Sequence, residues 1–115
     1  MSNDHPQSQR TFDQLVELIC RMKEHAMERR DYELLGMADR VDALLLRLVN
    51  ELNMKASHLL SQRTFARLVE LIRCIKRHAS EGEDQELLAT ADQVDALVRR
   101  LATEVNMEAS SAHPS

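Results

Sequence analysis

The sequence predicts an all-α fold in which two tandem helical hairpins form one antiparallel four-helix bundle. The chain aligns with itself without a gap when residues 8–57 are laid on residues 61–110, and 31 of the 50 aligned positions are identical. Apolar residues within each copy recur at steps of three and four, which is the spacing of one helix face. Only two Gly and two Pro interrupt a chain of 115 residues that is rich in helix-forming Leu, Ala, Glu and Arg.

The first apolar stripe of each copy predicts a helix that begins near Thr11 and, in the second copy, near Thr64. A threonine hydroxyl is a favourable N-cap, and Gln14 completes a capping box with Thr11. We expect the stripe residues of these helices to face the core: Phe12, Leu15, Ile19, Met22 and Ala26, and then Phe65, Leu68, Ile72, Ile75 and Ala79.

A turn is expected at residues 28–31 and 81–84, before the second helix of each copy. Asp31 and Asp84 stand where an N-cap is needed, and Gly82 can adopt the left-handed conformation that ends the preceding helix. The stripes of the second helices are Leu34, Ala38, Val41, Leu45, Leu48 and Leu52, matched by Leu87, Ala91, Val94, Val98, Leu101 and Val105.

Asn53 and Asn106 follow the last stripe residues and are expected to be left-handed C-caps, with Met54 and Met107 folding back on the preceding turn. These boundaries divide the chain into a disordered tail (1–7), the first repeat (8–57), a linker (58–60), the second repeat (61–110) and a second disordered tail (111–115).

One hairpin exposes an apolar face that it cannot cover alone, so we expect the two hairpins to pack together with pseudo-twofold symmetry. An alternative stays open, because no Gly or Pro lies between Gly36 and Gly82. In that alternative the second and third helices merge into one long central helix, and two chains form a dimeric bundle. A second copy of the chain is therefore one candidate partner.

Composition excludes several classes of function. The 15 basic and 19 acidic residues give a net charge of −4 without a long basic run, so nucleic acid is not an expected partner. No stretch approaches the roughly 18 apolar residues of a membrane span, and the first residues do not resemble a signal peptide. Cys20 and Cys74 lack Cys-x-x-Cys spacing, which suits a reducing compartment. We expect a cytoplasmic protein that does not bind membranes.

Each predicted second helix carries two aspartates three residues apart, on neighbouring parts of the surface beside its apolar stripe. They form either a solvated edge, with Arg99 supporting Asp95 from four residues away, or a site for docking or catalysis. Leu46, at the position equivalent to Arg99, adds an apolar side chain to one of these surfaces. The candidate partner-binding residues are Asp39, Asp42, Leu46, Asp92, Asp95 and Arg99.

Other chemical signals in the chain are incomplete. His25 and His78 stand near the ends of the first helices, where the helix dipole and the last carbonyls favour an imidazolium ion. A di-iron bundle needs Glu three residues before each His, but Met22 and Ile75 occupy those positions, and no zinc spacing occurs. Cys74 precedes His78 by four residues, yet the first copy has no thiol there. We therefore expect no metal, no cofactor and no catalytic cysteine.

The second helices contain Val41-Asp42-Ala43-Leu44-Leu45 and Val94-Asp95-Ala96-Leu97-Val98. In this respect the hairpin resembles the small aspartyl-phosphate phosphatases of the sporulation phosphorelay, whose second helix carries Ser-Gln-Glu-Leu-Asp-x-Leu-Ile. The aspartate and its apolar flanks match, whereas the Ser, Gln and Glu are absent. The resemblance implies that Asp42 and Asp95 are candidate catalytic carboxylates that orient water at the acyl phosphate of a response regulator.

No enzyme motif is complete, so we interpret the chain as a small cytosolic regulatory or adaptor bundle that presents helix faces to a protein partner. A response regulator is the most specific candidate partner, and aspartyl-phosphate hydrolysis the most specific activity. The alternative is a structural or assembly module, from a natural or an engineered duplication, that has no catalytic activity.

Overall fold

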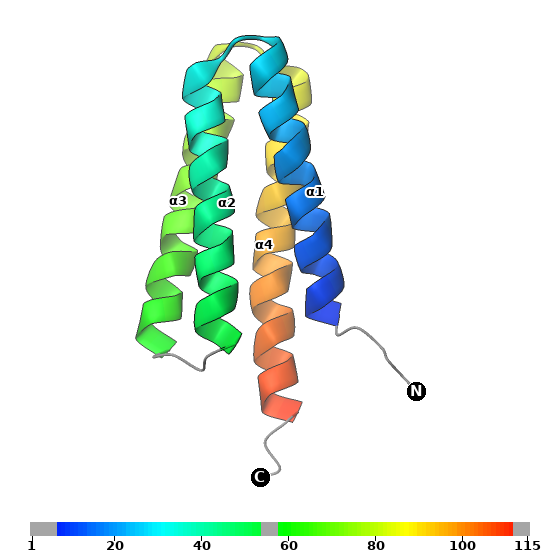
Figure 1. Cartoon of the computed structure of the whole chain (residues 1–115), viewed down its shortest axis with the longest axis vertical. Helices are drawn as coiled ribbons and strands as arrows, with labels where there is room; N and C mark the ends of the chain where they lie inside the picture. Colours follow the sequence, from blue (N-terminus) through cyan, green and yellow to red (C-terminus); the bar gives the residue numbers. More distant parts are fainter. Residues whose placement is uncertain (1–6, 54–57, 112–115) are drawn as a thin grey trace.

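The computed structural model describes residues 7–53 and 58–111, and these form four helices and no strand. The helices are α1 (Gln7–Glu28), α2 (Tyr32–Asn53), α3 (His58–Glu81) and α4 (Gln85–Ser111). Each helix packs against two neighbours in the cyclic order α1, α2, α3, α4, and the α1–α2 and α3–α4 turns lie at the same end of the bundle (Figure 1). The predicted four-helix bundle is confirmed.

The alternative with one long central helix is wrong. α2 ends at Asn53, and α3 begins at His58 and packs alongside α2. This packing covers the apolar stripes within a single chain, so the bundle does not require a second chain to complete its core, and the entropy cost of bringing two chains together is avoided.

The core consists of the predicted stripes, with one change near the start of α1 and of α3. The buried apolar side chains are at most 2% exposed, and they are contributed by all four helices. Phe12 and Phe65 are only partly buried, whereas the preceding threonines, Thr11 and Thr64, are 2% and 3% exposed. The side chains of Leu52 and Val105, which belong to the predicted stripes, lie outside the described side chains.

Thr11 and Thr64 are not N-caps, because α1 and α3 begin before them, at Gln7 and His58. The Thr11 hydroxyl lies 3.3 Å from the carbonyl oxygen of Gln7 and 2.6 Å from a carboxylate oxygen of Glu104 in α4. A threonine inside a helix can bond the carbonyl four residues earlier in this way. The Thr64 hydroxyl makes the equivalent cross-repeat contact, at 2.8 Å from Glu51 in α2. These threonines therefore form a buried polar layer between the repeats.

Other helix ends also differ from the prediction. The expected linker, residues 58–60, forms the start of α3, because Leu59 and Leu60 favour a helix and no Gly or Pro interrupts them. Asn106 is not a C-cap, since the good helix formers that follow it carry α4 on to Ser111. α2 does end at Asn53, whereas Met54 lies outside the described residues. Of the two expected tails, residues 1–6 and 112–115 also lie outside them, and Gln7 and Ser111 are helical.

The α1–α2 and α3–α4 turns are confirmed at the predicted positions, and each has the same backbone geometry. In the first turn, the amide of Arg30 bonds the carbonyl of Met27 and the amide of Asp31 bonds that of Ala26, which is a Schellman motif. The left-handed residue is Arg30 (φ 58°) and, in the second turn, Glu83 (φ 52°). The prediction that Gly82 is left-handed is wrong: it precedes the left-handed position by one residue, and no described glycine has a positive φ.

The left-handed backbone at residues 30 and 83 predicts that glycine there stabilises the fold. Glu83→Gly should raise the free energy of unfolding by about 1 kcal/mol, because a side chain with Cβ is strained in this conformation. Gly82→Ala should not lower it, since the added Cβ would lie 3.5 Å from the His78 carbonyl oxygen, an ordinary contact. Urea unfolding of both variants tests this. A loss of stability in Gly82→Ala with no gain in Glu83→Gly would contradict it.

Candidate functional site

The turn aspartates join the two repeats at one end of the bundle. The Nε2 atom of His78 lies 2.6 Å from Oδ2 of Asp31, and His25 makes the same contact with Asp84 at 2.6 Å. The second oxygen of Asp31 accepts a hydrogen bond from the amide of Leu34 at 3.1 Å, so the predicted N-cap is confirmed. Asp84 caps α4 in the same way. One carboxylate therefore starts its own helix and also binds the other repeat.

The sequence predicts that His25 and His78 contact the last carbonyls of their own helices, but in the structure each contacts an aspartate of the other repeat instead. The reason is that a partly buried carboxylate is a stronger hydrogen-bond acceptor for an imidazole than a carbonyl at a helix end. The hydrogen bond that His78 donates to Asp31 raises the pKa of His78 and outweighs burial, which lowers it. Burial raises the pKa values of Asp31 and Asp84, but the hydrogen bonds from the histidines and the caps outweigh it and lower both.

The candidate aspartates of the second helices lie in two equivalent ion-pair clusters. In the first repeat, Lys23 of α1 lies 3.3 Å from Asp39 and 3.1 Å from Asp42. Burial lowers the pKa of Lys23, but its hydrogen bonds to the two aspartates outweigh burial and raise it. The cluster therefore joins α1 to α2 within one repeat. Leu46, four residues after Asp42, is 53% exposed on the same side of α2.

The second cluster joins α3 to α4. Lys76 lies 3.1 Å from Asp92 and 2.9 Å from Asp95, and Arg99 lies 3.1 Å from Asp95. The contact predicted between Arg99 and Asp95 is therefore confirmed. Burial raises the pKa of Asp95, but the hydrogen bonds from Lys76 and Arg99 outweigh it and lower the pKa. The structure thus groups the six predicted partner-binding residues as two separate sets. The four aspartates pair with a lysine of their own repeat, Arg99 pairs with Asp95, and Leu46 stands at the position that corresponds to Arg99.

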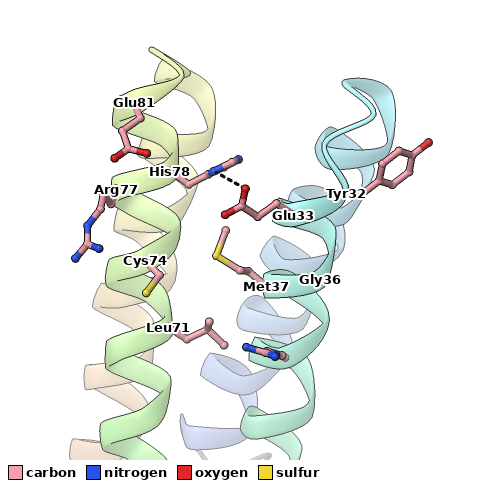
Figure 2. A pocket seen from close by; sticks show the side chains of 10 residues that line it. Tyr32, Glu33, Gly36, Met37, Leu71, Cys74, Arg77, His78 and Glu81 are labelled. Carbon is pink, nitrogen blue, oxygen red and sulfur yellow. Dashed lines mark ion pairs between the residues drawn. The ribbon is translucent and has the colours of Figure 1, made fainter.

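A groove lies between α2 and α3, close to the end of the bundle that holds the turns. It encloses about 630 Å³ and is lined from α2 by Tyr32, Glu33, Gly36, Met37 and Arg40, and from α3 by Leu71, Cys74, Arg77, His78 and Glu81. Figure 2 shows the Met37 and Leu71 side chains between the two helices and Cys74 on α3, with the His78–Glu33 ion pair above them and Tyr32 extending away. The groove therefore has a floor of apolar and sulfur-containing side chains and a charged rim.

The equivalent face between α1 and α4 is different. A groove on this face lies farther from the turns, encloses about 180 Å³ and is lined by Gln14, Glu17, Leu18, Arg21, Gln93 and Leu97. Of these residues, only Leu18, Arg21 and Gln93 are equivalent to residues that line the α2–α3 groove. Arg21 stands at the position of Cys74, Ala89 at that of Gly36 and Thr90 at that of Met37, so this face has an arginine in place of the thiol and lacks the methionine. The sequence prediction missed the α2–α3 groove. The signal for it lies in the positions at which the two repeats differ, and of these the prediction used only Leu46 and Arg99.

Cys74 and His78 do not form a catalytic pair in this groove. Cys74 is partly buried and Cys20 is exposed, and both thiols are free. His78 uses Nε2 for Asp31, and its Nδ1 atom lies 3.8 Å from Glu33, so both ring nitrogens face carboxylates rather than the Cys74 thiol. The groove is thus better suited to binding than to nucleophilic chemistry.

Within residues 7–53 and 58–111, no three His, Cys, Asp or Glu side chains converge as a metal site requires. None of the four described helices holds an apolar stretch of the length that crosses a membrane. Comparison of the chain with protein-family models, with curated proteins and with solved structures finds no match.

The His78–Asp31 pair predicts that stability depends on pH in two directions. The raised pKa of His78 means that its contribution is complete below its ordinary value of 6.5 and is lost as the pH rises through the folded-state pKa. The lowered pKa of Asp31 means that its contribution is present above its ordinary value of 3.8 and is lost as the pH falls through the folded-state pKa. The free energy of unfolding should therefore be highest between about pH 4 and pH 6.5.

Asp31→Asn distinguishes the contribution of the ion pair to stability from that of the N-cap, because asparagine is also a good N-cap but carries no charge. The decline in stability between pH 6 and pH 9 should be smaller in Asp31→Asn and in His78→Gln than in the parent protein. Asp13→Asn, which changes an exposed aspartate of α1, is the matched control and should leave the decline unchanged. Identical declines in all four proteins, measured by urea unfolding, would show that the pair does not govern this pH range.

Proposed function

We propose that the protein is a regulatory adaptor of the cytoplasm that binds another protein through the α2–α3 face, defined as the groove between α2 and α3 and the residues that line it. The observation that carries the proposal is that this groove is lined by Gly36, Met37 and Cys74, where the α1–α4 face has Ala89, Thr90 and Arg21. The same bundle geometry supports both faces, so the open groove is not a requirement of the fold. The free thiols of Cys20 and Cys74 suit a reducing compartment.

The chemistry of the α2–α3 face suits a protein partner. Met37, Leu71 and Cys74 offer an adaptable apolar floor, since methionine and cysteine side chains are polarisable and fill irregular spaces. Tyr32 at the rim is 72% exposed, and tyrosine is enriched at protein interfaces because it adds a large contact area at a low entropy cost. These features support binding of apolar side chains from another helix.

A photo-reactive phenylalanine derivative at position 32 should therefore form a covalent adduct with a different polypeptide in the cells that produce the protein. The matched control has the photo-reactive derivative in place of Gln85, which is the equivalent position of the second repeat, and this variant should form no adduct. Adding Gly36→Ala and Cys74→Arg places the residues of the α1–α4 face in the groove and should abolish the adduct from position 32.

Two other results would count against the adaptor proposal. Adducts of equal yield from both positions, or from neither, would favour the alternative of a structural module. An adduct with twice the mass of the chain would identify a second copy as the occupant, and would favour an assembly module.

A more specific form of the proposal follows from the resemblance to aspartyl-phosphate phosphatases. In this form the partner is a phosphorylated response regulator, and Asp42 and Asp95 act on its acyl phosphate. One observation favours it: a lysine holds each aspartate at the same position in both repeats. An ionised carboxylate in a fixed position is what orientation of water requires.

This form predicts that the protein shortens the lifetime of the phosphorylated receiver domain of a response regulator from the same cells. Replacing Asp42 and Asp95 together by asparagine should slow this hydrolysis about a hundredfold, which is typical for loss of a general base. Asp13→Asn is the control, and circular dichroism should show equal helicity in all variants. A lifetime that the parent protein does not change would reject the phosphatase activity and leave the adaptor proposal in place.

A further inference from the structure

α3 is a basic helix in an acidic protein. It carries five Lys and Arg residues and two Glu residues, whereas α1, the equivalent helix of the first repeat, carries three Lys and Arg residues and four Asp and Glu residues. The chain as a whole has a net charge of −4. Charge of one sign that is concentrated on one element produces a local potential that attracts groups of the opposite sign.

Arginines and glutamates both lie at the α2–α3 groove. Arg40 of α2 and Arg77 of α3 line it, as do Glu33, which lies 3.8 Å from His78, and Glu81. Arg67 lies four residues before Leu71, which also lines the groove, and Arg63 lies four residues before Arg67, so helical spacing places both on the groove side of α3. All four arginines are exposed, and none joins an ion pair or a side-chain hydrogen bond with another described residue. Their charges are therefore available to a partner.

The bundle does not need this basic surface. On the α1–α4 face, the positions of Arg40, Arg67 and Arg77 are occupied by Gln93, Gln14 and Glu24. Only Arg63 has a basic equivalent, Arg10. The same backbone geometry thus accepts neutral and acidic side chains at three of the four positions. The bundle therefore does not require positive charge at these positions of the α2–α3 face.

We propose that the occupant of the α2–α3 face is an acidic amphipathic helix of another protein. This inference rests on the proposed function and names the chemistry of the partner. The apolar side of the helix covers Met37, Leu71 and Cys74, and its carboxylates pair with the arginines around the groove. Arginine and carboxylate form strong, often bidentate, hydrogen-bonded pairs, and complementary charge fixes the orientation and the register of the bound helix.

The shape of the groove favours a helix as the occupant. The groove-lining residues of α3 extend from Leu71 to Glu81, which is about 15 Å at 1.5 Å per residue, and Arg63 extends this side of α3 by a further 12 Å or so. Such a length accommodates a helix of three to five turns that lies along α2 and α3. The described residues offer no strand edge, so recognition by addition of a strand to a sheet is not available.

The probe that tests this inference is a fluorescent 18-residue peptide with Leu along one helix face and Glu on the remaining positions. Fluorescence anisotropy should show binding that weakens as salt is raised from 50 to 200 mM, because the arginine pairs are exposed to screening. The variant Arg40→Gln with Arg67→Gln and Arg77→Glu should bind at least tenfold more weakly. It is expected to fold, since it installs the side chains of the α1–α4 face.

The matched control is Arg10→Glu with Arg21→Glu, which changes the net charge by the same amount on the α1–α4 face and should bind the peptide as the parent protein does. A peptide with Lys in place of Glu should not bind. Equal weakening in the two variants would show that only net charge matters and would overturn the inference. So would tighter binding of a single-stranded oligonucleotide, or of vesicles that contain phosphatidylserine, than of the acidic peptide.

The two proposals fail in distinguishable ways. A covalent adduct from position 32 together with no binding of the acidic peptide would overturn the acidic-helix inference and leave the adaptor function in place. The absence of both would overturn both proposals, because the α2–α3 face would then have no protein occupant.

Discussion

The bundle depends on the burial of four apolar stripes, since no single hairpin can cover the stripes of its own two helices. Leu15 and Ile19 of α1, and Leu68 and Ile72 of α3, are at most 1% exposed. Burial of one such side chain contributes about 1.5–3 kcal/mol relative to exposure. A separated hairpin would expose its half of this core to water. Each repeat therefore completes the other, and the duplicated chain acts as a dimer in which both halves belong to one polypeptide.

Apolar burial alone does not fix how the two hairpins align along the bundle axis, because displaced packings of similar helices bury similar areas. The polar contacts between repeats supply this information. Histidine–aspartate pairs lie at the turns and threonine–glutamate hydrogen bonds lie toward the opposite end. A displacement of one repeat by one turn would break all four contacts and leave partly buried carboxylates unpaired. These contacts thus select one alignment, and their occurrence in equivalent pairs accounts for the pseudo-twofold arrangement.

Features that depend on local sequence were predictable, and features that depend on contacts between repeats were not. The stripes, the turns and the N-caps Asp31 and Asp84 follow from residue spacing and propensity, and the structure confirms them. Thr11 was predicted as a cap because its local pattern favours one, but Glu104, which lies far away in the sequence, draws its hydroxyl into the core. The histidine contacts and the α2–α3 groove were missed for the same reason. The histidine contacts and the groove are each formed by side chains of two different helices, and the distance between those helices is set only when the bundle packs.

The duplication separates the residues that build the fold from those that distinguish its two faces. His, Asp, Thr and Glu at the cross-repeat contacts, and the Lys and Asp residues of the ion-pair clusters, are the same in both repeats. Core positions differ only by side chains of similar size, such as Met22 and Ile75 or Leu45 and Val98, which a packed core accommodates at low cost. The changes that alter charge or open space lie instead on the outer faces, where Arg77 replaces Glu24 and Cys74 replaces Arg21. Because neither the core nor the cross-repeat contacts involve these positions, the α2–α3 face can acquire a binding surface without loss of the bundle that positions it.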